Sequence, residues 1–202
     1  MAKIGVKGSE IIAGARRQGK RIIVLAGRPY HVDPEVNHGI DHLITRHVCL
    51  GFYELLPFWY AFWTSLGFAV HTSPVSTRGL YLAGQATIPS DTACFPAKLS
   101  HGHIKALSQM QLDAIFYPCL TYNVDEGLGD NHYNCPVVAY YPEVLAGNCP
   151  ELEGKKFIYD YVGIHRPKDF VHKMAKEVLP KYFGGISERE VQAAADADRK
   201  SV

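Results

Sequence analysis

The stretch RIIVLAG, residues 21–27, indicates the fold class. It is a short run of β-branched and other apolar residues that ends at a glycine, a pattern typical of a strand buried on both faces of a parallel sheet. We expect further strands at HVCLGFY (47–53), FAVHTS (68–73), LDAIFYPC (112–119), CPVVAYY (135–141) and KKFIYDYV (155–162). Helical patterns lie between and after these runs. Such alternation predicts an α/β fold, a doubly wound, mostly parallel sheet of Rossmann-like or flavodoxin-like kind with helices on both faces.

Length and composition set the broad class. The chain has 202 residues, of which 47% are hydrophobic, so we expect a single α/β domain over residues 1–202. Residues 1–20 are expected to form an N-terminal helix or a flexible lead, and residues 187–202 a C-terminal helix. The 21 basic residues barely exceed the 20 acidic ones, which argues against a nucleic-acid partner.

The N-terminal residues also indicate the compartment. Residues 1–20 contain no apolar segment of the kind found in secretory signals, so a cytoplasmic location is expected. In that compartment the five cysteines would be reduced, which favours metal binding or catalysis over disulfides.

One aromatic stretch approaches the length of a membrane span. It is FYELLPFWYAFWTSLGFAV, residues 52–70, whereas a spanning helix needs about 20 apolar residues. Glu54 and Pro57 interrupt the run, so we expect a buried helix with an aromatic face and no membrane association. If residues 52–66 were instead exposed, they would be a contact surface for a partner protein.

Three cysteines stand at the predicted boundaries of elements, each beside or near a proline. Cys94 opens a helix, Cys119 closes a strand and Cys135 follows a polar loop. Proline fixes the backbone and stiffens a loop, and ligands of doubly wound sheets sit outside the carboxyl ends of the strands. The three thiols are therefore a candidate metal site, although free cysteine is also a common small core residue.

The spacing of the cysteines bears on which metal they would hold. Zinc, completed by His101, His103 or His132, usually takes ligands in close C-x2-C pairs, and none occurs here. Wide spacing favours an iron–sulfur cluster, and three cysteines would leave one iron open to water or substrate. Cys49 lies in an apolar run and is expected in the core, while Cys149 is a possible fourth ligand.

Polar residues near Cys94 form a second part of this candidate site. On a helix, Lys98 and His101 at positions i+4 and i+7 share the face of Cys94. A lysine and a helix N-terminus would offset the negative charge of thiolates. The alternative is an ordinary solvated helix face. We expect Lys98, His101 and His103 to tune or frame the site rather than bind metal.

Two loops carry further candidates. In DNHYNCP, Asn131 and His132 crowd Cys135 and would hydrogen bond to cluster sulfurs, although such residues also simply make turns. In RPYHVDPEVNH, residues 28–38, His31 is a candidate ligand for a phosphate, a carboxylate or a metal. No G-x-x-x-x-G-K-[ST] or G-x-G-x-x-G motif occurs in the chain, so phosphate-loop nucleotide binding has no support.

Several segments together resemble a known family. They are YELLPFW, IPSDTACFPAKLSHGHI, IFYPC, DNHYNCPVVAYYPEVL and IVLAGRPYHVDPEVNHGI. They are similar to the uncharacterised domain attached to CoA-substrate-specific enzyme activases, the proteins linked to 2-hydroxyacyl-CoA dehydratases. A weaker similarity extends to the cluster-binding subunits of 2-hydroxyacyl-CoA dehydratases and benzoyl-CoA reductases.

The resemblance implies a site and a function. It places Cys94, Cys119 and Cys135 as ligands of an iron–sulfur cluster, either [4Fe-4S] or a double cubane, that serves low-potential electron transfer in an anaerobic setting. It implies a redox partner or an ATP-dependent activator protein, an acyl-CoA or other small-molecule substrate, and a homo- or hetero-oligomer. Whether the chain is itself an enzyme stays open; it would be a component of a dehydratase or reductase system.

Two features depart from the family pattern. In the large family proteins the GRPYH segment follows the cysteine segments, whereas here it precedes them. The acidic and glycine-rich phosphate motifs of the activase ATPase part are missing from this chain. ATP-driven activation is therefore not expected of this polypeptide alone.

Overall fold

A parallel sheet organises the protein. The computed structural model describes residues 10, 12–25, 50–125 and 131–197. Within these residues the sheet has four strands in the order β2-β1-β3-β4, and every pair is parallel. The strands are β1 (Arg21–Leu25), β2 (Phe68–Thr72), β3 (Ala114–Phe116) and β4 (Phe157–Ile158). The expected doubly wound parallel α/β fold is confirmed.

The strand order places a switch point at the centre of the sheet. The chain moves from β1 outward to β2, then returns past β1 to add β3 and β4 on the other side. Ile22 and Ile23 of β1 are buried, as expected for a central strand covered on both faces. The order reverses between β1 and β3, and such sheets bind ligands outside the carboxyl ends of the strands at this point.

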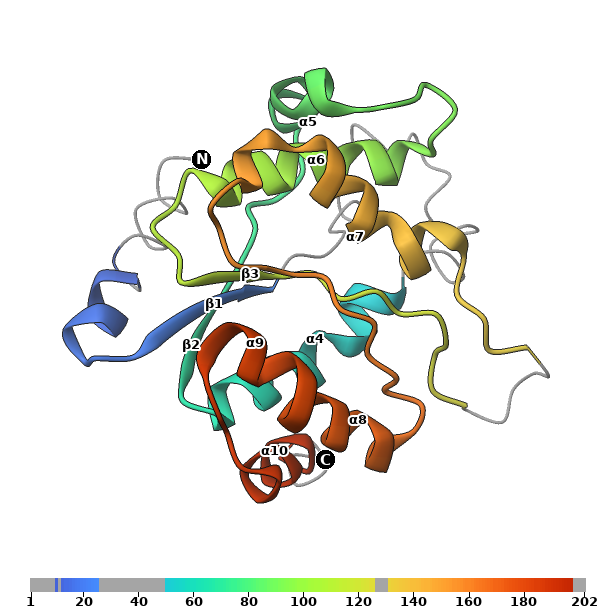
Figure 1. Cartoon of the computed structure of the whole chain (residues 1–202). Helices are drawn as coiled ribbons and strands as arrows, with labels where there is room; N and C mark the ends of the chain where they lie inside the picture. Colours follow the sequence, from blue (N-terminus) through green and yellow to red (C-terminus); the bar gives the residue numbers. More distant parts are fainter. Residues whose placement is uncertain (1–9, 11, 26–49, 126–130, 198–202) are drawn as a thin grey trace.

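A helical layer covers each face of the sheet (Figure 1). On one face lie α4 (Leu50–Ser65), α8 (Pro167–Lys173), α9 (Leu179–Phe183) and α10 (Glu188–Ala195). A π-helical segment, Met174–Val178, joins α8 to α9. On the other face lie α5 (Arg78–Gly84), α6 (Phe95–Ser108) and α7 (Pro136–Asn148). Single turns at Gln85–Thr87 and Pro150–Leu152 follow α5 and α7.

The aromatic segment is the buried helix that its sequence predicts. Trp59, Phe62 and Trp63 of α4 are at most 6% exposed, and the Trp63 ring lies 5.0 Å from that of Phe116 on β3. These three side chains are therefore core and do not form the alternative contact surface. Among the helices in the described part of the chain, none is long and apolar enough to cross a membrane.

Two predicted strands are wrong. Of HVCLGFY, residues 47–53, the described part from Leu50 onward forms the start of α4. CPVVAYY, residues 135–141, forms the first half of α7. Pro136 occupies the first helical position, where proline's fixed φ favours a helix start. Further along, Tyr141 and Leu145 are buried on one face, and this packing overrides the strand preference of the valines and tyrosines. At the other end of the chain, α10 begins with a capping box formed by Ser187 and Glu190.

Candidate functional site

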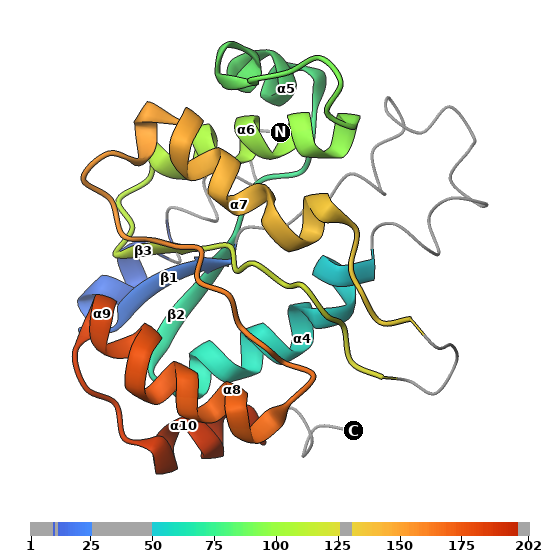
Figure 2. The ribbon, with the colours of Figure 1, turned by 45° about the vertical axis from the view of Figure 1, so that its right-hand side comes forward.

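The carboxyl edge of the sheet gathers the cysteine-bearing segments. In a parallel sheet, each strand end and the start of the helix that follows it lie at this edge. The segment after β3 carries Cys119, which makes a parallel bridge to Tyr161 beyond β4. The starts of α6 and α7 lie on the same side of the molecule (Figure 2).

Cys94 and Cys135 occupy matching positions at the starts of α6 and α7. Each is the N-cap residue, with φ −60° and ψ 150° at Cys94 and φ −60° and ψ 151° at Cys135. Both are exposed, and neither side chain makes a capping hydrogen bond. Helix N-termini offer N–H groups and the positive end of the helix dipole to an anionic ligand.

Contacts between α6 and α7 show that the two helices run in the same direction. His101 of α6 meets Tyr141 of α7, and further along, Lys105 Nζ lies 3.6 Å from Glu151 Oε1 beyond the end of α7. The two N-cap cysteines are therefore at the same end of the helix pair.

Cys119 has a different environment. Its side chain is 0% exposed, and burial, followed by the nearby carboxylates of Glu143 and Asp160, raises its pKa to about 12. Glu143 belongs to the second half of α7, so Cys119 lies against that half of the helix rather than its N-terminus. At neutral pH Cys119 is a protonated thiol.

The three cysteines do not form a ready-made metal centre. Within residues 12–25, 50–125 and 131–197, no group of three or more His, Cys, Asp or Glu side chains could hold a metal ion. Cys94 and Cys135 have the exposure and the helix N-termini that suit cluster ligands, whereas Cys119 is buried. The three-cysteine site stays a prediction.

Lys98 ties the start of α6 to the preceding turn. Its ammonium Nζ donates to the Asp91 carbonyl oxygen at 2.7 Å and lies 3.9 Å from the Asp91 carboxylate. This contact holds in place the turn that leads to Cys94, so Lys98 supports the backbone beside the candidate site.

His101 is buried between α7 and the turn that follows α5. Its Nδ1 lies 2.8 Å from Thr87 Oγ1, and its Nε2 lies 3.0 Å from the Tyr141 hydroxyl. Thr87 donates its own hydroxyl proton to the Gly84 carbonyl, so Thr87 Oγ1 accepts from His101 Nδ1–H. Burial lowers the pKa of His101 to about 4, so the ring is neutral at pH 7 and Nε2 accepts from Tyr141. Both nitrogens have partners, which leaves neither free to bind a metal.

Cys149 belongs to the same buried network, which sequence reasoning missed. Its Sγ lies 3.5 Å from His101 Nδ1 and 3.8 Å from Thr87 Oγ1. Burial raises the pKa of this thiol to about 11. The sequence positions 87, 101, 141 and 149 do not predict this network, because the network depends on how α6 and α7 cross.

His103, another candidate zinc ligand, is also buried. Its Nε2 lies 3.0 Å from Ser76 Oγ, and burial lowers its pKa to about 4. His103 therefore belongs to the packing of α6 against residues that precede α5.

The candidates before Cys135 shape a turn. His132 Nε2 lies 3.6 Å from Asp125 Oδ1, and Asn131 Oδ1 accepts a hydrogen bond of 3.1 Å from the Tyr133 N–H. Such an arrangement is the ordinary turn chemistry of asparagine. His31 and Cys49 lie outside the described residues.

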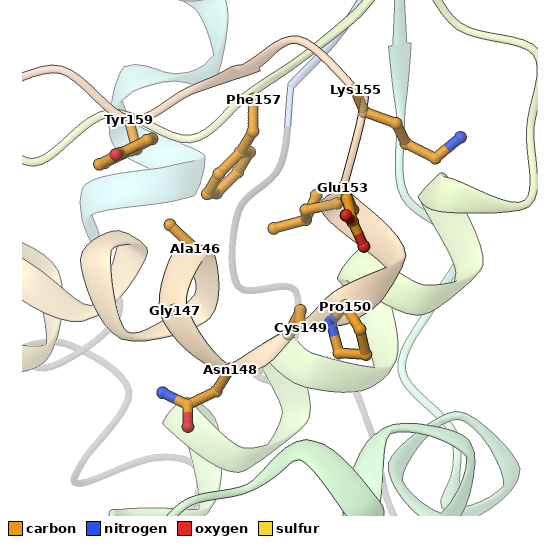
Figure 3. Close-up of a pocket in the computed structure, with 10 residues that line it drawn as sticks. Ala146, Gly147, Asn148, Cys149, Pro150, Glu153, Lys155, Phe157 and Tyr159 are labelled. Atoms are coloured by element: carbon orange, nitrogen blue, oxygen red, sulfur yellow. The ribbon is translucent and has the colours of Figure 1, made fainter.

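Two of the cavities among the described residues are large enough to hold a small molecule. The larger, about 440 Å³, is surrounded by the last turn of α7, the turn after it and the aromatic rings of Phe157 and Tyr159 (Figure 3). Cys149 lines it, but the thiol is engaged with Thr87 and His101. It lies at the C-terminal end of α7, away from Cys135. A second cavity of about 300 Å³ lies among α4, α8 and α10.

The fold and the carboxyl edge of its sheet together define the class of protein. It is a doubly wound α/β domain in which two helices with N-cap cysteines begin near the switch point of the sheet. A family model described as the CoA enzyme activase uncharacterised domain matches residues 1–49 and 47–201. The chain belongs to this family. No curated protein and no solved structure matched the chain.

Proposed function

We propose that this domain is an iron–sulfur component of a CoA enzyme activase system. Cys94 and Cys135 would be the outer ligands of the cluster, and Cys119 the third. The observation that carries the proposal is the matched pair of exposed cysteine N-caps at the same end of α6 and α7.

The residues around the two caps would serve the bound cluster in two ways. Prolines at position 96 and position 136 stiffen the two helix starts, which holds both sulfurs in position. The first N–H groups of α6 and α7 have no partners within their own helices, and they would donate to the anionic sulfurs. When bound, the cluster supplies one-electron transfer.

Cys119 would enter the site only on assembly. Its buried thiol, with a pKa of about 12, must lose its proton to bind iron, and metal binding drives such deprotonation. Part of the free energy of cluster binding would offset the cost of exposing Cys119. Because the thiol must lose its proton to bind iron, the affinity for iron would rise with pH.

Family membership supports a partner enzyme, because a CoA enzyme activase acts on another protein. The chain has no G-x-x-x-x-G-K-[ST] motif, so the electron would come from a separate redox partner or ATP-dependent activator. The acyl-CoA substrate would belong to the partner enzyme or lie near the open iron. We place the domain in a reducing, anaerobic compartment.

The test is metal analysis of protein purified without oxygen. We expect iron and acid-labile sulfide, with a brown visible absorption. Replacing Cys94→Ser or Cys135→Ser should remove most of the iron, and Cys119→Ser should lower it. The control is Cys149→Ser, whose sulfur lies in the His101 network and should leave the iron content unchanged.

Two outcomes would reject the proposal. A folded, metal-free anaerobic protein would show that the cysteines hold no cluster. Stoichiometric zinc without sulfide would instead support a zinc site, with His132 as the most exposed of the three histidine candidates.

A further inference from the structure

The cavity among α4, α8 and α10 lies at the carboxyl edge of the sheet, on the face opposite α6 and α7. Leu55 and Phe58 come from the first half of α4, and Ile164 and His165 come from the chain between β4 and α8. The start of α4, the end of β4 and the start of α8 all belong to this edge (Figure 1). Its volume is about 300 Å³.

The walls of the cavity are mostly apolar. Leu55, Phe58, Ile164 and Phe170 line it, and the rings of Phe58 and Phe170 lie 5.7 Å apart. An apolar cavity of about 150 Å³ holds benzene, so twice that volume suits about two fused rings. This size is at the lower end of ordinary small-molecule pockets.

One polar side chain of the cavity has an unmet hydrogen-bonding capacity. His165 lines the cavity, and its Nδ1 is buried without a hydrogen-bond partner among the described residues. Its ring is held against Tyr122, with centroids 4.9 Å apart. Buried polar atoms normally have partners. Because this nitrogen has almost no accessible surface, a ligand's polar group in the cavity would reach it only after the imidazole ring turns about its Cβ–Cγ bond.

The charges of the lining residues narrow the class of ligand further. Asp196 is the one carboxylate among the described lining residues, and no lysine or arginine is among them. Asp196 Oδ2 accepts a hydrogen bond from Gln192 Nε2 at 2.9 Å. An anionic ligand would meet this carboxylate without a cation to balance it, so anions are disfavoured.

We propose that this cavity binds a small uncharged molecule with one or two rings, or an equivalent carbon chain, and one hydrogen-bonding group for His165. The proposal is independent of the cluster, because the cavity and the N-cap cysteines Cys94 and Cys135 are on opposite faces of the sheet.

The experiment uses two probes of the same shape, naphthalene-2-carboxamide and 2-naphthoate. Calorimetric titration of the full chain should give a Kd of ~1 mM or tighter for the uncharged amide, and binding at least about tenfold weaker for the anion. Methyl NMR signals of Leu55, Val124 and Ile164, which line the cavity, should shift with the amide.

Variants locate the binding. Ala195 lines the cavity, so Ala195→Leu should fill it and weaken amide binding at least about tenfold. Ala193→Leu is the matched control, because Ala193 is exposed on the same helix and its replacement should leave binding unchanged. His165→Phe keeps the ring but removes the nitrogen, and should weaken binding several-fold.

Melting temperatures of the variants establish that they fold. The proposal is overturned if neither probe binds up to its solubility limit, if the anion binds as tightly as the amide, or if Ala195→Leu binds like Ala193→Leu. If His165→Phe bound the amide as tightly as the unchanged protein does, the ligand would not need a hydrogen-bonding group for His165.

Discussion

His101 and His103 are the buried titratable residues with the clearest consequence for stability. Burial is the main reason why the pKa of each is lowered from 6.5 to about 4, and the Glu151 carboxylate acts in the opposite direction at His101. Both rings are neutral partners in the packing of α6. Protonation therefore favours the unfolded chain, where a histidine has an ordinary pKa.

This gives a pH dependence with a definite sign. The stabilising effect of the neutral rings is complete above about pH 6.5 and is lost as the pH falls from there toward 4. At pH 5 the free energy of unfolding should be lower than at pH 7.5 by roughly 2 kcal/mol for each histidine. Urea unfolding at the two pH values measures the difference. His103→Gln should remove about half of it, and an unchanged pH dependence would contradict this assignment.

The four described cysteines should differ sharply in reactivity. Cys94 and Cys135 are exposed, whereas Cys119 and Cys149 are buried with pKa values raised to about 12 and about 11. In metal-free folded protein at pH 7.5, iodoacetamide should alkylate Cys94 and Cys135 at least about 100 times faster than the buried pair. Peptide mass spectrometry over time measures each site. Rapid alkylation of Cys119 without unfolding would show that its thiol is already available to a ligand.

At the scale of elements, α5 and α6 meet at two glycines. A Cβ atom on Gly84 would lie 2.2 Å from the backbone nitrogen of Gly102, and one on Gly102 would lie 2.1 Å from the Leu80 carbonyl oxygen. Either contact lies far inside van der Waals distance, and backbone atoms cannot rotate away. The close approach also sets the position of Thr87, which binds His101.

Alanine at these glycines should separate the helices. We expect Gly84→Ala or Gly102→Ala to lower the free energy of unfolding by about 2–4 kcal/mol, because the backbones must move apart. Gly147 of α7 is the control, since a Cβ there has no neighbour within 4 Å, and Gly147→Ala should be neutral or stabilising by up to about 1 kcal/mol. Denaturant unfolding measures both. If the three substitutions changed the free energy of unfolding by the same amount, α5 and α6 would not cross as closely as the structure shows.

The elements show which features the sequence could predict. The β-branched run at residues 21–27 predicted a buried central strand, and the alternation predicted the parallel sheet. The valines of CPVVAYY predicted a strand, because local preference carries no information about the partner helix that buries Tyr141 and Leu145. The position of Cys135 at an element start was still right, since Cys-Pro marks a boundary in either case.

The candidate site was harder to predict than the fold, for a physical reason. Helical spacing placed His101 on the face of Cys94, but it could not reveal that Thr87 and Tyr141 hold both ring nitrogens. Such contacts arise between elements and depend on crossing angles. The cavity beside His165 was missed for the same reason, because α4, α8 and α10 that line it are distant in sequence.

At the scale of the whole molecule, β3 joins two cores. Ile115 packs into the core beneath α6 and α7, whereas the neighbouring Phe116 packs into the aromatic core beneath α4 and α8. Successive side chains of a strand point to opposite faces, so this single short strand belongs to both. The two helical layers should therefore unfold together.

Phe116→Ala tests this coupling. The side chain is 1% exposed and its ring lies 4.7 Å from that of Trp59, so truncation should lower the free energy of unfolding by about 3–5 kcal/mol. Fluorescence of Trp59 and Trp63, the chain's two tryptophans, reports the α4 face, and pulse alkylation of buried Cys149 reports the α7 face. Both denaturant midpoints should fall together, because loss of β3 removes a wall from each core. Tyr60→Ala, an exposed α4 side chain, should move neither midpoint by much. If the tryptophan midpoint fell while that of Cys149 stayed in place, the two faces would be separate folding units, and a ligand bound on one face could not stabilise the other.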